Sequence, residues 1–324
     1  MLDSLLTEQI RNDDEIAGML ARYNGRPAFF FQKSPQDTDP GWQKPCFPRV
    51  DYNVDMSYSA ERKTSGSLNV NVWCSSESAF MPEDIERRLR ELIHGAFYTE
   101  SSHGAERAQE AKPALGSTVC AIWARSDAFS FDSPTYVGTD TAPEVFGITL
   151  SFDLSEFPAQ YIERPADNQG RRPGDEYPDP VSALNAWTCS RFHNAVVIGC
   201  VALPPVWKPS DETPAIYWRA EGEASTDRQS YSVTWFEGRY AAHVVSPGVA
   251  SRNGVVSAML AALQRDGEVM MADGSPMFVR QTSARHGADP LRDGQIALTG
   301  RYGILTGGSA DNDSQPLRRI NFIK

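Results

Sequence analysis

The stretch that decides the fold runs from Tyr231 to Leu305 and opens with Tyr231-Ser-Val-Thr-Trp-Phe-Glu-Gly-Arg-Tyr-Ala-Ala-His-Val-Val245. Residues such as Val233 and Trp235 alternate with their neighbours along this run, as in a half-buried β-strand. Pro247 and Gly248 end the strand, and apolar residues then recur every three or four positions up to Leu263. That spacing predicts a helix with one apolar face, closed by a glycine at 267.

Two more strands are expected after this helix, at residues 268–271 and 277–285. The segment between them, Ala272-Asp-Gly-Ser275, contains the Asp-Gly pair that favours a hairpin turn. A last strand is expected at residues 295–305. The whole stretch therefore predicts a sheet with a helix packed across one face.

The same order of elements is expected in the first half of the chain. A helix at 2–22, a short strand at 28–31 and a Pro-rich loop at 34–44 precede strands at 47–56 and 67–74, a helix from Pro82 to Phe97, and strands at 118–124 and 145–154. A helix at 181–192, a strand at 195–201, a Pro-rich loop at 205–214 and a strand at 215–223 lead into the stretch described above. Such self-similarity predicts an internal duplication.

We therefore expect an α+β protein of two tandem domains, each a mostly antiparallel sheet with helices packed on one face. The first domain is predicted at residues 1–157 and the second at 181–324. Residues 158–180 hold five prolines and no periodic pattern, which is typical of a linker.

Composition limits the classes of function. The chain has 324 residues, 40% of them hydrophobic, and a net charge of -11, which disfavours sequence-specific binding of nucleic acid. It contains neither an apolar run near the ~20 residues of a membrane span nor a signal-peptide pattern at its start, so we expect a cytoplasmic protein without a membrane partner. The five cysteines are predicted to be reduced core thiols.

Catalytic motifs are missing from the sequence. It has no phosphate-binding glycine loop, no dinucleotide fingerprint, no nucleophile elbow and no Cys/His spacing suited to zinc. We therefore predict no catalytic residue, no cofactor and no metal. The densest polar cluster is Arg285-His-Gly-Ala-Asp-Pro290, which could bind an anion or act as acid and base, so an enzyme using this loop stays open as an alternative.

Seven residues are candidates for contacts with other proteins. Tryptophans in Pro-rich loops would suit a protein interface if exposed, and the cluster described above offers exposed polar groups. The segment at 318–324, Arg-Arg-Ile-Asn-Phe-Ile-Lys, has a strand-like pattern that a neighbour or an open sheet edge could hold. The candidates are Trp42, Trp207, Arg285, His286, Asp289, Arg318 and Phe322.

This order of elements resembles the tail-terminator and tail-completion proteins of tailed bacteriophages. The second half carries the resemblance best, through the run from Tyr231 to Pro247, the helix up to Ala262, Asp273-Gly-Ser-Pro-Met277 and Leu298-Thr-Gly-Arg-Tyr302. In the first half, Leu5-Leu-Thr-Glu and Arg26-Pro-Ala-Phe-Phe resemble the openings of such proteins. These motifs are hydrophobic patterns rather than catalytic signatures. Members of the family are commonly about half this length, so the chain resembles a duplicated member.

The resemblance implies a structural virion protein that forms a ring, usually sixfold, at the end of the tail tube. Such a ring stops tube polymerisation and joins the tail to the neck. Its implied partners are further copies of the chain, in rings of three or six, the tail tube protein, a neck or head-completion protein and, in some tails, the sheath. The implied location is the virion tail or neck, after assembly in the host cytoplasm. A neck or baseplate adaptor is the alternative within the same assembly.

Overall fold

The computed structural model describes residues 2–57, 65–99, 118–130, 145–157, 179–200, 203–226 and 233–305. It contains helices and mostly antiparallel sheets, as the sequence predicts for an α+β protein. The elements are α1 (Leu2–Arg11), α2 (Asp14–Met19), β1 (Arg22–Tyr23), β2 (Arg26–Pro27), β3 (Phe29–Phe31), β4 (Trp42–Gln43), β5 (Arg49–Ser57), β6 (Ser65–Ser75), α3 (Pro82–Ile93), β7 (Ala96–Thr99), β8 (Thr118–Ser130), β9 (Val145–Phe157), α4 (Pro180–Arg191), β10 (Val196–Val197), β11 (Val206–Trp207), β12 (Ala215–Ser225), β13 (Val233–Val245), α5 (Val249–Asp266), β14 (Glu268–Met270), β15 (Pro276–Ala284) and β16 (Ile296–Leu305).

The chain forms two compact units. The first unit consists of Met1–Pro158 together with Leu203–Lys208, and the second of Ala159–Ala202 together with Pro209–Lys324. The predicted linker lies outside the described residues except for its last two positions. There Asp179 caps the start of α4 by accepting hydrogen bonds from the backbone N–H groups of Val181 and Ser182, both at 3.1 Å.

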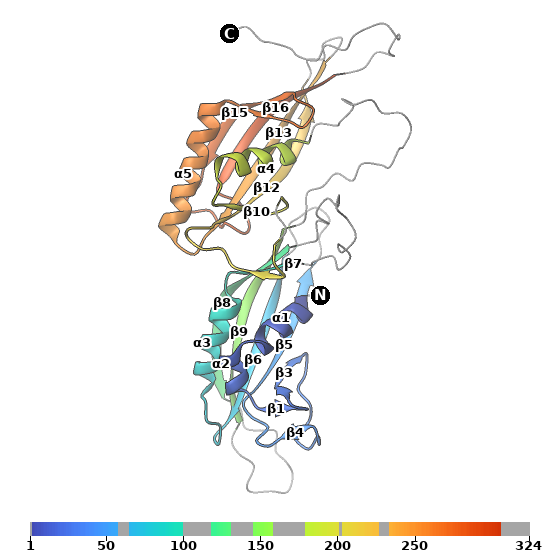
Figure 1. The fold of residues 1–324 in the computed structure, drawn as a ribbon, viewed down its shortest axis with the longest axis vertical. Helices are drawn as coiled ribbons and strands as arrows, with labels where there is room; N and C mark the ends of the chain where they lie inside the picture. The colour runs from blue at the N-terminus through green and yellow to red at the C-terminus, as the bar shows by residue number, and fades with distance from the viewer. Residues whose placement is uncertain are drawn as a thin grey trace, which may run out of the picture. The chain divides into compact units, whose positions relative to one another are not determined.

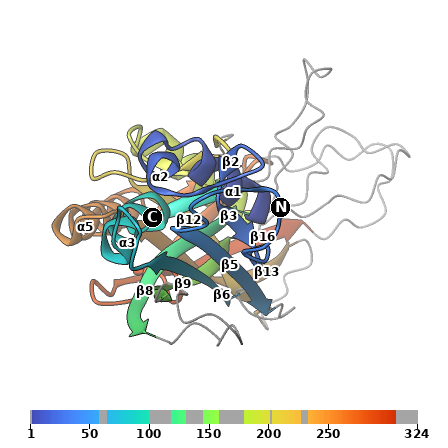
Figure 2. The ribbon, with the colours of Figure 1, turned by 90° about the horizontal axis from the view of Figure 1, so that it is seen from below.

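The first unit is built on a seven-stranded sheet in the order β11-β7-β8-β9-β6-β5-β3. All neighbouring strands are antiparallel except β3 and β5, which are parallel. Helices α1, α2 and α3 cover one face of this sheet (Figures 1 and 2). Their apolar residues, among them Leu6, Ile16 and Leu89, are fully buried against the strands.

The second unit is built on a six-stranded sheet in the order β10-β12-β13-β16-β15-β14. Here β10 and β12 are parallel and the other neighbours are antiparallel. Helices α4 and α5 pack on one face (Figure 1). The core between them includes Leu184 of α4, Val256 and Met259 of α5, and Trp218 of β12.

The two sheets share one topology. Without β11, the first sheet reads β3-β5-β6-β9-β8-β7, and the second reads β10-β12-β13-β16-β15-β14. In each order the first two strands are parallel. Along the chain, the long helix of the first unit, α3, connects β6 to the edge strand β7. In the same way, α5 of the second unit connects β13 to the edge strand β14. The repeat of elements predicted from the sequence is therefore present as a repeat of strand order and direction.

The segment from Val233 to Leu305 folds as predicted into β13, α5, the β14–β15 hairpin and β16. Gly267 ends α5 in the left-handed conformation at φ 70°, which glycine adopts without strain. The core side of β13 is formed by even-numbered residues, including Tyr240, Ala242 and Val244. Trp235 lies on the opposite face with the Arg301 guanidinium 4.7 Å from its ring centre.

The first helix differs from its prediction. The apolar pattern predicts one helix over residues 2–22, but the chain breaks after Arg11 and restarts at Asp14. The Asp13 side chain accepts a hydrogen bond from the Ile16 backbone N–H at 3.0 Å and so caps α2. Asp13 Oδ2 also lies 2.7 Å from Nη2 of Arg88 on α3. This ion pair and the cap favour a new helix start over continuation of α1.

Replacing Asp13 with alanine should destabilise the first unit by about 1–2 kcal/mol at pH 7, because the cap and the Arg88 partner are both lost. The hydrogen bond from Arg88 holds the pKa of Asp13 below its usual range. A lowered pKa stabilises the fold above the unfolded pKa of about 3.9, and this contribution disappears as the pH falls through the folded value. The difference between wild type and Asp13→Ala should therefore shrink below about pH 4 in urea unfolding. Asp14→Ala, at the exposed next position, is the control.

Three other boundaries differ from the predictions. Phe97, expected on α3, lies in β7, because Gly95 at φ 74° ends the helix region two residues earlier. β8 continues to Ser130, beyond its expected end at 124. Val206–Trp207, expected in a loop of the second half, pairs antiparallel with β7 in the first unit. Periodicity alone does not show which strand a two-residue segment will join.

Among the described helices, none has both the length and the apolar character needed to cross a membrane.

Candidate interaction surfaces

The structure places Trp42 in the interior rather than on a surface. Its side chain is only 8% exposed and packs against Tyr23 and Phe30, with ring centres 5.1 and 5.7 Å away. The indole N–H donates to the Gln36 backbone oxygen at 2.9 Å. Trp42 belongs to β4 of a small sheet in the order β2-β1-β4, and it holds the Pro-rich loop in place. A tryptophan must be exposed to contact a partner protein, and Trp42 is buried, so it does not meet this requirement of the predicted interface role.

Trp207 is half-buried in β11 at the edge of the first sheet. Its ring centre lies 5.8 Å from that of Phe97 on β7. The next residue, Lys208, donates from Nζ to the backbone oxygen of Glu91 near the end of α3. Pro204, Pro205 and Pro209 flank this short strand. Because proline lacks a backbone donor, this segment discourages addition of a further strand.

The cluster at residues 285–290 forms the turn between β15 and β16. Arg285, His286 and Asp289 are all exposed. Asp289 Oδ1 accepts the Leu291 backbone N–H at 2.8 Å, and the Pro290 backbone oxygen lies 2.8 Å from Nδ1 of buried His243. Asp289 thus has a structural role in shaping the turn. Arg285 and His286 are available to a partner on its surface.

The remaining two candidates, Arg318 and Phe322, lie outside the described residues. Within the described ranges, no group of three His, Cys, Asp or Glu side chains is arranged to hold a metal ion.

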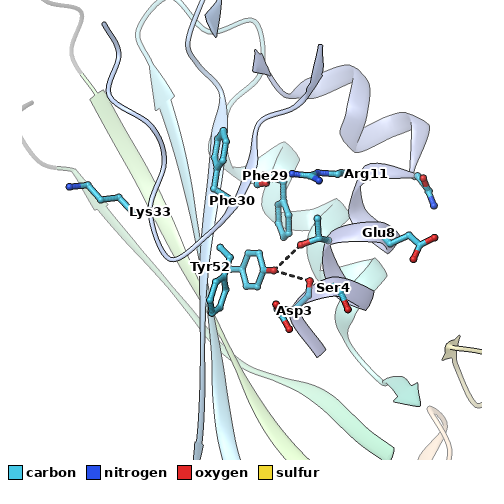
Figure 3. A pocket seen from close by; sticks show the side chains of 11 residues that line it. Asp3, Ser4, Glu8, Arg11, Phe29, Phe30, Lys33 and Tyr52 are labelled. Atoms are coloured by element: carbon cyan, nitrogen blue, oxygen red, sulfur yellow. Dashed lines mark hydrogen bonds between the residues drawn. The ribbon is translucent and has the colours of Figure 1, made fainter. Parts of the chain in front are cut away.

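A shallow, open hollow of about 520 Å³ lies between α1 and β3 in the first unit (Figure 3). Tyr52 forms its floor: the hydroxyl donates to the Asp3 backbone oxygen at 2.8 Å and lies 2.8 Å from Thr7 Oγ1. The Tyr52 ring stacks on Phe29 with centres 4.8 Å apart, and burial raises the pKa of Tyr52. Phe31 borders the hollow and is 46% exposed. The hollow offers an aromatic surface to an apolar group.

The strand edge beside this hollow is partly closed. Alternate residues of a strand direct their backbone groups to opposite edges, so those of Phe29 and Phe31 face away from β5. Arg11 Nη2 donates to the Phe29 oxygen at 3.1 Å, and the Lys33 N–H donates to the Phe31 oxygen at 2.9 Å. Since both outward carbonyl groups already accept hydrogen bonds, pairing with another strand is disfavoured here.

The face of the first sheet opposite its helices carries a polar network. Asp51 accepts hydrogen bonds from Asn71 Nδ2 at 2.8 Å and from Trp73 Nε1 at 2.7 Å. Thr149 Oγ1 donates to Asn71 Oδ1 at 2.8 Å, so the network spans β5, β6 and β9. Burial raises the pKa of Asp51 despite these donors. Asn and Asp are disfavoured in strands, so their presence here marks this face of the sheet as a polar surface.

Apolar side chains are exposed at the same place in both units. Met81, at the N-cap of α3, is 54% exposed and follows Phe80, which is 36% exposed. Val249, the first residue of α5, is 59% exposed. Because α3 and α5 occupy equivalent positions in the repeated topology, the two units present apolar groups at corresponding helix starts.

Sequence reasoning missed both the polar network and these helix starts. Asp51, Asn53 and Asp55 alternate with apolar residues, as do Asn69 and Asn71, and this pattern could have indicated a polar sheet face. Met81 directly precedes one predicted helix, and Val249 begins another. The exposure of a residue at a helix start produces no periodic pattern in the sequence, so it was not predicted.

Comparisons with known proteins give little further information. No protein-family model matches the chain, and no curated protein matches it. Among the solved chains that match, one is 15% identical, covers 50% of this chain and 98% of its own, and has a TM-score of 0.28. This similarity is too weak to support a fold or a function.

Proposed function

We propose that this chain is a structural virion protein of the tail-terminator type, whose copies form a ring at the end of a phage tail tube. In this role the ring stops tube polymerisation and joins the tail to the neck, so its partners are the tail tube protein and a neck or head-completion protein. The observation that carries the proposal is the repeat of one α+β topology in both units.

A repeated module suits a ring for a geometric reason. A closed ring uses heterologous contacts, in which one surface of a subunit meets a different surface of the next. A chain with two modules offers each kind of surface twice, so three chains present six modules and six chains present twelve. Met81 and Val249 mark equivalent apolar surfaces on the two modules. Because apolar side chains are exposed at corresponding positions of both modules, we expect these helix starts to be buried between subunits of the ring.

Light scattering on the purified chain should give about 107 or 215 kDa, three or six times the 35.8 kDa of one chain. The double variant Met81→Asp, Val249→Gln should give the mass of one chain, because both apolar contacts are removed. Methionine cannot cap a helix, whereas aspartate can, so α3 should not be destabilised by the change. Circular dichroism should therefore show an unchanged fold.

The matched control is Gln43→Asp, an exposed position in the first unit away from the helix starts. It should leave the mass of the assembly unchanged. A wild-type protein that is monomeric at every concentration, alone and with tail tube protein, would contradict the proposed ring. A ring that persists in the double variant would instead place its contacts on other surfaces.

A further inference from the structure

The two sheets differ at one equivalent strand edge. In the repeated order of strands, β7 of the first unit and β14 of the second unit occupy the same place, and each follows the long helix of its unit. The outer edge of β7 is covered by β11, which pairs with it antiparallel. Among the described residues, no strand pairs with the outer edge of β14.

The pairing of β11 with β7 shows which groups this kind of edge uses. Phe97 pairs with Trp207, and the Thr99 backbone N–H donates to the Pro205 oxygen at 3.0 Å. Alternate residues of a strand direct their backbone groups to the same edge, so Phe97 and Thr99 direct theirs toward β11. The Phe97 side chain is fully buried, with its ring centre 5.8 Å from those of Trp207 and Phe157.

Met270 is the counterpart of Phe97 on β14. The Met271 backbone N–H donates to the Ser275 oxygen at 2.9 Å, so Met271 directs its backbone groups toward β15. The backbone groups of the preceding residue, Met270, therefore point to the outer edge. Its side chain lies on the face without helices, because its neighbours Val269 and Met271 belong to the core under the helices.

The surroundings of Met270 and Phe97 differ in their cover. Phe97 is completely buried, whereas Met270 is 53% exposed. β14 contains neither proline nor lysine, the residues that commonly protect a strand edge. An exposed apolar side chain beside outward backbone groups suits strand addition, in which backbone hydrogen bonds supply affinity and side chains supply specificity.

We propose that the outer edge of β14 binds a short extended segment of a partner protein, as β7 binds β11 in the first unit. The segment carries an aromatic side chain that packs on Met270, in the place that Trp207 takes on Phe97. Methionine sulfur makes favourable contacts with aromatic rings. A basic residue beside the aromatic one is favoured, because Glu268 is exposed on the same strand and Lys208 follows Trp207 in β11.

A very short segment is enough for such a contact. β11 consists of two residues, Val206–Trp207, and β14 of three. A free peptide should therefore bind weakly, whereas a partner held nearby by other contacts would reach a high effective concentration at this edge. The inference rests on the two strand edges and is independent of the proposed ring.

The probe is a peptide with the sequence of residues 203–209, Leu-Pro-Pro-Val-Trp-Lys-Pro, blocked at both ends. The full-length chain is isotope-labelled at its methionine methyl groups, and the Met270→Leu variant identifies the Met270 signal in the NMR spectrum. Titration should shift this signal in a saturable way, because the indole ring lies against the Met270 side chain. Met81 is the matched control: it is 54% exposed at a helix start, and its signal should not move.

A second peptide separates strand addition from apolar contact alone. It carries a methyl group on the backbone nitrogen of its tryptophan, so it keeps the indole ring but lacks the N–H that would donate to the edge of β14. Loss of this hydrogen bond should weaken binding by about threefold to tenfold.

Three results would overturn the proposal. A Met270 signal that stays in place up to millimolar peptide would show that the edge accepts no strand. Equal binding of the two peptides would show that the side chains alone make the contact. A Met270 signal that moves when the protein is diluted without peptide would show that a second copy of the chain occupies the edge.

Discussion

Replacement of Trp218 by alanine should destabilise the second unit by about 3–5 kcal/mol, a large share of the 5–15 kcal/mol that stabilises a typical domain. Trp218 is the largest fully buried side chain there, at 1% exposed. Its indole N–H donates to Thr188 Oγ1 at 2.8 Å, and that hydroxyl donates to the Leu184 oxygen at 2.7 Å. The substitution therefore leaves a cavity between β12 and α4 and removes the partner that joins them.

Hydrogen exchange measured by mass spectrometry should show faster exchange in α4 and in β12 to β16 of this variant. Trp235→Ala is the matched control, since Trp235 lies on the helix-free face of the same sheet and is only half-buried. It should have a smaller effect. Thr188→Val keeps the volume but leaves the indole N–H without its acceptor, which should cost about 1–3 kcal/mol. Equal protection in wild type and Trp218→Ala would show that the core has been assigned to the wrong residues.

Replacement of Tyr52 by alanine should have a comparable effect on the first unit, about 3–5 kcal/mol by analogy with other large aromatic side chains. Tyr52 is 1% exposed, stacks on Phe29, and connects β5 to α1 through Thr7 and the Asp3 backbone oxygen. Loss of the ring removes the floor of the hollow and the contact that holds α1 against the sheet.

Two control variants separate the roles of the Tyr52 ring and hydroxyl. Tyr52→Phe keeps the stacking but removes the hydroxyl, so it should cost about 1–2 kcal/mol. Phe31→Ala, on the neighbouring strand and 46% exposed, should change stability by less than Tyr52→Ala. In hydrogen exchange, α1 should lose protection first in Tyr52→Ala. An α1 that stays protected would mean that its apolar residues Leu6 and Ile10 suffice to hold it.

Long periodic segments were predictable because one physical pattern determines each of them. The alternation in β13 and the three- and four-residue spacing in α5 identified both elements, and the Asp-Gly pair identified the hairpin between β14 and β15. The repeat of elements followed from the same patterns. The same patterns did not show which face of β13 packs against the core, since Tyr240 and Trp235 are both large aromatic residues and lie on opposite faces.

Features that depend on tertiary contacts were not predictable. The break between α1 and α2 depends on Arg88, which is far along the chain from Asp13. The placement of Val206–Trp207 in the first unit depends on pairing with β7. Burial of Trp42 depends on Tyr23 and Phe30, so its exposure could not be judged from a Pro-rich setting.

Negative-stain electron microscopy of the purified chain tests the proposed ring most directly, because averaged images report closure and symmetry together. Two modules of one topology per chain predict closed particles with threefold or sixfold symmetry. Single particles the size of one chain, or open filaments of varying length, would contradict a ring-forming terminator.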